Sequence, residues 1–220
     1  INSIYGIKHK TWSFLISNPI YLSLFYNGVR NMGYNTAIVS CPKCGHHEQI
    51  NLLTSCNSLF EVEERKAILN KSAFSYKCSS CGQICKIIPS CVYTNPVNKF
   101  YIYLDSKENL SSYNVIPGYS QMDSNGYRHY GATSPSDLIN KILSLEYKED
   151  PRIAELAIDM TLERFNRNFP KEDMSDCFLF VDNENNSKLS IAIIVGNGTR
   201  FYSSPYPFGD IKRFNNGIKS

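Results

Sequence analysis

The sequence predicts an α+β fold, and three features support this class. Short segments that alternate between apolar and polar residues flank two Cys-x-x-Cys-Gly motifs, as in strands joined by tight turns. Two longer segments place apolar residues at helical spacing and begin with helix-capping residues. Asn197-Gly198 lies between two apolar segments near the end, as expected for a β-hairpin turn. With 220 residues, the chain is long enough for one hydrophobic core with an appended part.

The first half of the chain is organised around the two motifs, CPKCG at 41–45 and CSSCG at 78–82. Strands enter and leave each motif and KFYIYL forms another, so strands are expected at 35–40, 48–53, 73–77, 83–88 and 99–104. Residues 59–70 place apolar side chains among Glu and Lys, which predicts a short helix between the motifs. Residues 105–133 are rich in Ser, Asn, Gly and Tyr without a period, which predicts a long loop.

Two helices with strong start signals follow. Ser134-Pro135-Ser136-Asp137 offers an N-cap, a first-turn proline and an acidic residue, and Asp150-Pro151 repeats the pattern. Only a few residues join the two helices, so they should pack as neighbours or lie end to end. The apolar residues expected on their buried faces are Leu138, Ile139, Ile142 and Leu143, then Ile153, Leu156, Ala157, Met160 and Phe165. Beyond Pro170 strands return, expected at 177–181, 188–195 and 199–202.

The composition is that of an ordinary globular protein and argues against nucleic-acid binding. Hydrophobic residues make up 42% of the chain, and the mean hydropathy is -0.29. The net charge of +3 comes from residues 1–35, which hold Lys8, Lys10 and Arg30 and no acidic residue. The remaining 20 basic residues balance 20 acidic ones, whereas polyanion binding requires a local excess of Lys and Arg. Weak nucleic-acid binding is therefore kept only as an alternative.

The start of the chain allows three interpretations. Residues 11–29 carry no charge and follow two lysines, as in a signal peptide or signal anchor. However, Asn18-Pro19 interrupts the apolar run, and no small-residue cleavage site follows it. Met32 could mark the natural start behind a non-native or poorly ordered extension, since the chain opens with Ile1. A packed native element is the third interpretation. Residues 1–34 are accordingly expected to be an extension, with membrane association only if 11–29 are an anchor.

The two motifs predict one metal site. Two thiolates separated by two residues reach the same ion only where the backbone curls tightly, and the residue after the second cysteine then needs a positive φ. Gly45 and Gly82 adopt it without steric cost, and Pro42 pre-sets one φ. The curl also directs backbone N–H groups toward sulfur. Two such turns supply four thiolates, the set that zinc prefers in closed structural sites. The predicted ligands of one structural zinc ion are Cys41, Cys44, Cys78 and Cys81, with iron as the alternative.

Other roles for these cysteines fit their surroundings less well. A redox dithiol is usually activated by a helix N-terminus or a cation, whereas each motif is bounded by strands and ends in Gly. A catalytic zinc keeps an open position and often uses His or a carboxylate. His46 and His47 could replace a ligand, yet they adjoin a complete set of four thiols. The scattered cysteines are expected in the core as small apolar residues, namely Cys56, Cys85, Cys91 and Cys177.

The stretch from 36 to about 165 resembles the CpXC domain, a family of bacterial and archaeal proteins with two Cys-Pro-x-Cys motifs and no assigned activity. The resemblance rests on CPKCG, the helix between the motifs, CSSCG, KFYIYL and SPSDLINKILSLEYKEDPRIAEL. Ser79 stands where the family has Pro, which loosens one turn but removes no ligand. The resemblance implies a metal-stapled α+β domain of an intracellular prokaryotic protein and implies no reaction.

These observations together predict zinc-ribbon-like antiparallel hairpins with an inserted helix, two further helices and a C-terminal β-hairpin around one core. The zinc-binding domain is expected at 35–170, with 171–220 a β-rich segment that packs on it. The expected function is that of a cytoplasmic protein without catalytic residues that acts through contact with a protein or small ligand. The alternative is an enzyme with a pocket beside the ribbon and the 105–133 loop, where His129 is a candidate binding residue.

Overall fold

The computed structural model of this chain describes residues 33–110, 125–182, 188–196 and 200–205. The chain forms two compact units, the first ending at Pro135 and the second beginning at Ser136. These units are defined by packing, so the domain boundaries expected at 34 and 170 stay predictions. The apolar stretch 11–29 and the Asn197-Gly198 turn lie outside the described residues.

None of the helices in the described ranges is both long enough and apolar enough to cross a membrane.

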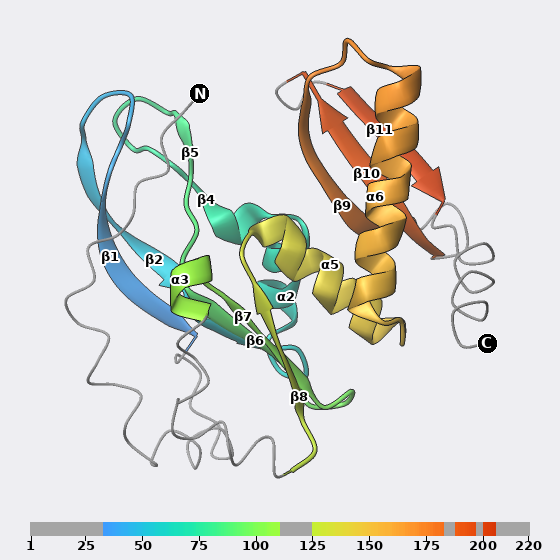
Figure 1. Cartoon of the computed structure of the whole chain (residues 1–220). Coiled ribbons are helices and arrows are strands. Elements are labelled where there is room, and N and C mark those ends of the chain that lie inside the picture. Colours follow the sequence, from blue (N-terminus) through green and yellow to red (C-terminus); the bar gives the residue numbers. More distant parts are fainter. Residues whose placement is uncertain (1–32, 111–124, 183–187, 197–199, 206–220) are drawn as a thin grey trace, which may run out of the picture. The chain divides into compact units, whose positions relative to one another are not determined.

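The first unit is built mainly of short strands with small helices between them (Figure 1). The strands are β1 (Tyr34–Ser40), β2 (His47–Leu53), β3 (Ser55–Asn57), β4 (Ser75–Lys77), β5 (Ile84–Lys86), β6 (Cys91–Asn95), β7 (Phe100–Leu104) and β8 (Arg128–Ala132). The helical segments are α2 (Val62–Leu69), the 3-10 turn η2 (Ser72–Phe74) and α3 (Lys107–Leu110). Strands and helices alternate irregularly along the chain, so the predicted α+β class is confirmed.

A four-stranded mixed sheet provides the apolar core of the first unit. Its strands lie in the order β3-β6-β7-β8, with β6 antiparallel to β7 and both outer pairs parallel. All five residues of β7 are buried, as expected for a strand covered on both faces. The rings of Tyr93 in β6 and Phe100 in β7 stack with centroids 6.1 Å apart. The strand predicted at 99–104 is therefore present, whereas β3 and β6 were not predicted.

The prediction of one long loop at 105–133 was wrong at both ends of that range. Lys107–Leu110 form α3, and Arg128–Ala132 form β8, which pairs with β7. Only the last residue of β8 is buried, so this strand has no apolar alternation from which it could be recognised. His129 is exposed, and its ring stacks on that of Tyr101 in β7 with centroids 5.8 Å apart.

The second unit combines two helices with a three-stranded antiparallel sheet. Its elements are α5 (Pro135–Glu146), α6 (Pro151–Asn168), β9 (Met174–Asp182), β10 (Lys188–Val195) and β11 (Arg200–Pro205). β10 lies between β9 and β11, so the expected C-terminal hairpin is part of a larger sheet. Phe165 of α6 packs against Ile193 and Val195 of β10, and its ring meets that of Tyr202 at 5.2 Å. These apolar contacts hold α6 on the sheet.

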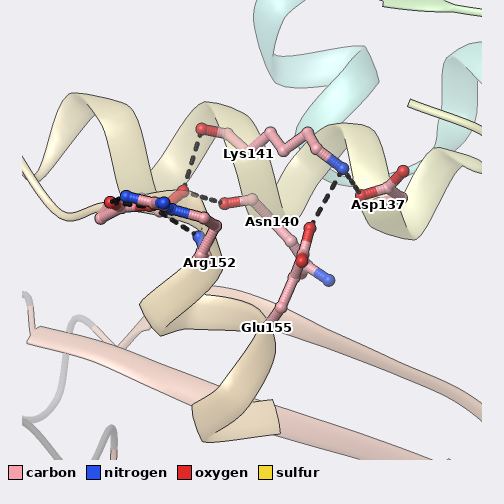
Figure 2. A network of polar contacts seen from close by, with 7 residues as sticks. Asp137, Asn140, Lys141, Arg152 and Glu155 are labelled. Carbon is pink, nitrogen blue, oxygen red and sulfur yellow. Dashed lines mark hydrogen bonds and ion pairs between the residues drawn. The ribbon is translucent and has the colours of Figure 1, made fainter. Parts of the chain in front are cut away.

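Polar contacts join the two helices of this unit. Lys141 of α5 pairs with Asp137 on its own helix and with Glu155 of α6, whose Oε1 lies 3.3 Å from Lys141 Nζ (Figure 2). The carboxylate of Asp150 accepts the backbone N–H of Arg152 at 2.9 Å, which caps the N-terminus of α6. The predicted cap is therefore confirmed, and the two helices contact each other through Lys141.

The buried faces agree with the prediction for α5 and only partly for α6. In α5 all four predicted apolar residues are buried. In α6, however, Leu156 and Met160 are 38% and 42% exposed. The buried face of α6 runs instead through Ala154, Ala157, Ile158 and Phe165. The two alanines on this face have small side chains, so another segment can approach the helix closely. A prediction based on large apolar residues misses such a face.

Candidate metal centre

Each Cys-x-x-Cys motif forms the turn of a two-stranded hairpin. β1 pairs with β2 around the first motif, and β4 pairs with β5 around the second. In the first turn the Cys41 N–H donates to the His46 carbonyl at 2.8 Å, and the Gly45 N–H donates to the Cys41 carbonyl at 2.9 Å. The second turn repeats both bonds at 2.9 Å, with the corresponding residues Cys78, Gln83 and Gly82. The positive φ predicted after each second cysteine is confirmed, at 72° for Gly45 and 70° for Gly82.

The four motif cysteines come together although the two motifs are far apart in sequence. Their sulfur atoms all lie within 4.8 Å of one another. The Sγ of Cys41 is 3.7 Å from that of Cys81, and the Sγ of Cys44 is 3.7 Å from that of Cys78. Four thiolates at about 2.3 Å from a central ion would stand about 3.8 Å apart at the corners of a tetrahedron. The spacing of these two sulfur pairs is therefore that expected around one tetrahedral metal ion.

The four side chains differ in their access to solvent. Cys41 and Cys78, the first cysteine of each motif, are 2% and 1% exposed. Cys81 is half-buried and Cys44 is exposed. All eight cysteines are free thiols, and 3.7 Å is far longer than a disulfide bond of about 2.05 Å. The cluster thus has a buried inner side and an open side at Cys44.

Backbone donors and neighbouring sulfurs set the charge of the cluster. The backbone N–H groups of Cys44 and Lys43 point at the Cys41 sulfur and lower the pKa of its thiol to about 6. At Cys81 the backbone N–H of Gln83 acts in the same direction, but burial and the Cys44 sulfur outweigh it and raise the pKa to about 12. The Cys41 thiolate therefore forms readily, and a second thiolate must form beside it against the repulsion of its negative charge. A bound cation would offset this repulsion and allow all four thiols to ionise.

A backbone contact also ties the two hairpins together. The Ser79 N–H in the second motif donates to Oε1 of Glu48 in β2 at 3.2 Å. The Cys-Pro-x-Cys motif of the CpXC domain has a proline at this position, which has no N–H and could not make this bond. The substitution that was expected only to loosen a turn therefore adds a contact between the hairpins.

Sequence reasoning missed the place of Cys85. It is buried, as expected of a core cysteine, but its Sγ lies 3.9 Å from the Cys41 Sγ, beside the proposed ligands. Tyr76, the residue opposite in β4, packs against the same cluster. A signal was available, since Cys85 follows Cys81 by only four residues on the strand that leaves the motif.

The other candidate residues are not members of the group that could hold a metal. His46 and His47 are exposed, and among the described residues the group that could hold a metal consists of the four motif cysteines. Cys56 in β3 and Cys91 in β6 are buried in the four-stranded sheet, as predicted. Cys177 in β9 is half-buried and packs beside Phe165.

Fold and site together define an α+β protein in which two hairpins present four cysteines that could hold one metal ion. The sequence model of the CpXC protein family matches residues 39–158, which is more than half of the chain and includes both motifs. The chain belongs to the CpXC family. No curated protein and no solved structure matches it.

Proposed function

We propose that this CpXC protein binds one structural zinc ion and acts through contact with a protein or a small ligand. The ligands are Cys41, Cys44, Cys78 and Cys81. The observation that carries the proposal is the 3.7 Å spacing of both nearest sulfur pairs, which agrees with the about 3.8 Å of a tetrahedral zinc site. Iron in the same set of sulfurs is the alternative, because four thiolates suit both metals.

The completeness of the ligand set favours a structural ion. Four protein thiolates fill all tetrahedral positions, whereas a catalytic zinc keeps one position for water or substrate. The ion also has a clear structural task, because few side chains of the hairpins are buried. In β1 only Val39 is fully buried, and in β5 only Cys85. The ion supplies the cohesion that an apolar core provides elsewhere in the unit.

Two further observations support the proposed contact with a partner and a cytoplasmic location. Ile38 of β1 and Ile84 of β5 are 76% and 67% exposed in the described part of the chain, so both hairpins offer apolar area for contact. Eight free thiols are typical of a reducing compartment, which supports a cytoplasmic protein.

Metal analysis of the purified chain tests the proposal. We expect one zinc per chain, with little iron and no visible absorption band. Cys41→Ser and Cys78→Ser should both lose the ion and unfold the hairpins, as followed by circular dichroism and amide exchange. Cys177→Ser is the matched control and should keep one zinc per chain. Normal folding of both ligand variants without metal would contradict the structural role.

A further inference from the structure

Cys85 brings a fifth sulfur to the proposed metal centre. It is the middle residue of β5, and its side chain is buried whereas those of Ile84 and Lys86 are exposed. Its Sγ lies 3.9 Å from that of Cys41, and it packs with the buried Cys41 and Cys78. The buried side of the β4–β5 hairpin therefore faces the four-cysteine cluster.

Cys85 is placed as a neighbour of the ligands and not as one of them. The set of sulfurs that all lie within 4.8 Å of one another contains the four motif cysteines and not Cys85. Four thiolates already complete a tetrahedral zinc site, so the fifth thiol keeps its proton. A thiol is a weak hydrogen-bond donor. Two acceptors lie near the Cys85 sulfur, the Gln83 carbonyl at 3.7 Å and the Cys41 sulfur at 3.9 Å.

The Cys41 sulfur is the stronger of these two acceptors once it is a ligand. Hydrogen bonds to an ionised acceptor are roughly twice as strong as those between neutral groups. The Gln83 carbonyl, in addition, already accepts the N–H of Cys78 at 2.9 Å. The Tyr76 hydroxyl also interacts with the Cys85 thiol, and the Tyr76 side chain packs against the cluster. The proton of Cys85 is therefore best placed toward Cys41.

The two hairpins brace each other in a reciprocal way. Glu48 follows the second cysteine of the first motif by four residues, and Cys85 follows that of the second motif by the same distance. Glu48 reaches the opposite turn, where it accepts the Ser79 N–H at 3.2 Å. Cys85 likewise reaches the opposite turn, at Cys41. In each hairpin, therefore, the residue four positions after the second cysteine contacts the turn of the other hairpin.

We propose that Cys85 is a positioning residue of the metal centre, whose S–H group donates a hydrogen bond to the Cys41 thiolate and slows release of the ion. This inference rests on the proposed four-cysteine metal site. The hydrogen bond orients one ligand and spreads its negative charge, which is the usual effect of partners that lie behind metal ligands.

Three variants of the full chain, loaded with Co(II) as a visible probe, separate this role from simple packing. Cys85→Val replaces the thiol with a slightly larger apolar side chain that has no donor, whereas Cys85→Ser keeps a donor in a smaller side chain. Cys91→Val, at a buried cysteine in β6, is the matched control. We expect Cys85→Val to release Co(II) to a chelator about 10- to 100-fold faster than wild type. Its thiolate charge-transfer band should also move to lower energy, because a sulfur without a hydrogen bond gives up electron density more readily. Cys85→Ser and Cys91→Val should stay close to wild type.

Four other results would overturn the inference. If Cys85→Val released Co(II) at the wild-type rate, Cys85 would have no role in holding the ion, whereas the proposed four-cysteine site would still stand. Fast release from both Cys85 variants without a spectral shift would assign the effect to packing. Loss of charge-transfer intensity in Cys85→Val would make Cys85 itself a ligand. Absence of Co(II) binding by the wild-type chain would overturn the proposed function, and the inference with it, before any variant is compared.

Discussion

The two hairpins and the four-stranded sheet are held together by different means, although they belong to the same compact unit. In the sheet, every residue of β7 is buried and aromatic rings stack between β6 and β7. In the hairpins, most side chains of β1 are exposed, and β4 has no fully buried residue. The buried residues nearest the hairpin turns are mainly cysteines, namely Cys41, Cys78 and Cys85.

The difference shows how a short chain can stabilise elements that are too small to bury much apolar surface. An isolated two-stranded hairpin is marginal in water, and the hairpins here are only three to seven residues deep. In the proposed metal site, binding of one ion by four thiolates would replace the missing apolar contacts. The hairpins should therefore depend on metal, and the sheet on packing.

The largest expected effect is that of metal removal. Structural zinc contributes about 10 to 16 kcal/mol in small zinc-binding peptides, so a strong chelator should unfold the hairpins selectively. Hydrogen exchange followed by mass spectrometry should show loss of protection in β1, β2, β4 and β5, with β6 and β7 still protected. Added zinc should restore the original pattern. Equal loss of protection in hairpins and sheet would mean that the two regions are not held independently.

The converse change removes packing from the sheet. Ile102, in the middle of β7, is fully buried, so Ile102→Ala should lower the free energy of unfolding by about 2 to 5 kcal/mol. Urea denaturation measures this loss, and metal analysis should still find one zinc per chain. Val97→Ala is the control, since Val97 is 74% exposed and its truncation should change stability by less than about 0.5 kcal/mol. Loss of zinc from the Ile102→Ala variant would contradict the separation of the two regions.

Alkaline pH should weaken the sheet through its buried thiols. Burial, and then the nearby Asp105 carboxylate, raise the pKa of Cys91 to about 12, and burial raises the pKa of Cys56 as well. The unfolded chain ionises first, near the ordinary thiol pKa of about 9. The contribution of these protonated thiols to the free energy of unfolding is therefore fully present below pH 9. It declines between pH 9 and 12, by up to about 1.4 kcal/mol per pH unit for each thiol.

The Cys91→Val variant isolates this contribution. Its unfolding free energy, measured at several pH values between 8 and 11, should fall less steeply than that of wild type. The comparison of slopes removes the common effect of the tyrosines. Equal slopes in both proteins would show that Cys91 does not titrate with unfolding.

The smallest effect concerns the contact between the two turns. Glu48→Ala removes the acceptor of the Ser79 N–H and should cost about 0.5 to 1.5 kcal/mol in the metal-bound protein, toward the lower value because the contact is exposed. Ser79→Pro removes the donor. In a double-mutant cycle, Glu48→Ala should therefore have little further effect in the Ser79→Pro background. Additive effects would show that the hydrogen bond is not formed.

Local chemistry explains what could be predicted from the sequence. The Cys-x-x-Cys-Gly motifs fix their own turns, so the positive φ of Gly45 and Gly82 and the meeting of the four sulfurs followed from spacing alone. The apolar run of β7 and the cap at Asp150 were equally local signals. All of these depend on residues within a few positions of one another, apart from the pairing of the two motifs.

Features that depend on distant partners were not predictable in the same way. β3 and β8 pair in parallel with strands that are remote in the chain, and neither alternates between apolar and polar residues over enough positions. Cys85 faces Cys41 across 44 positions of sequence, so a local pattern could indicate its burial but not its neighbour. Leu156 and Met160 were assigned to the wrong face because small alanines, not large side chains, line the buried side of α6.

The crossed arrangement of the sulfurs also bears on the unfolded chain. Each nearest pair joins the first cysteine of one motif to the second of the other, across 40 and 34 positions. An ion that stays bound would close a loop of this length, and a cross-link over such a loop lowers the entropy of the denatured ensemble by the equivalent of about 4 kcal/mol. Helix α2 lies wholly inside this loop. Its stability should therefore respond to metal, although none of its side chains belongs to the sulfur cluster.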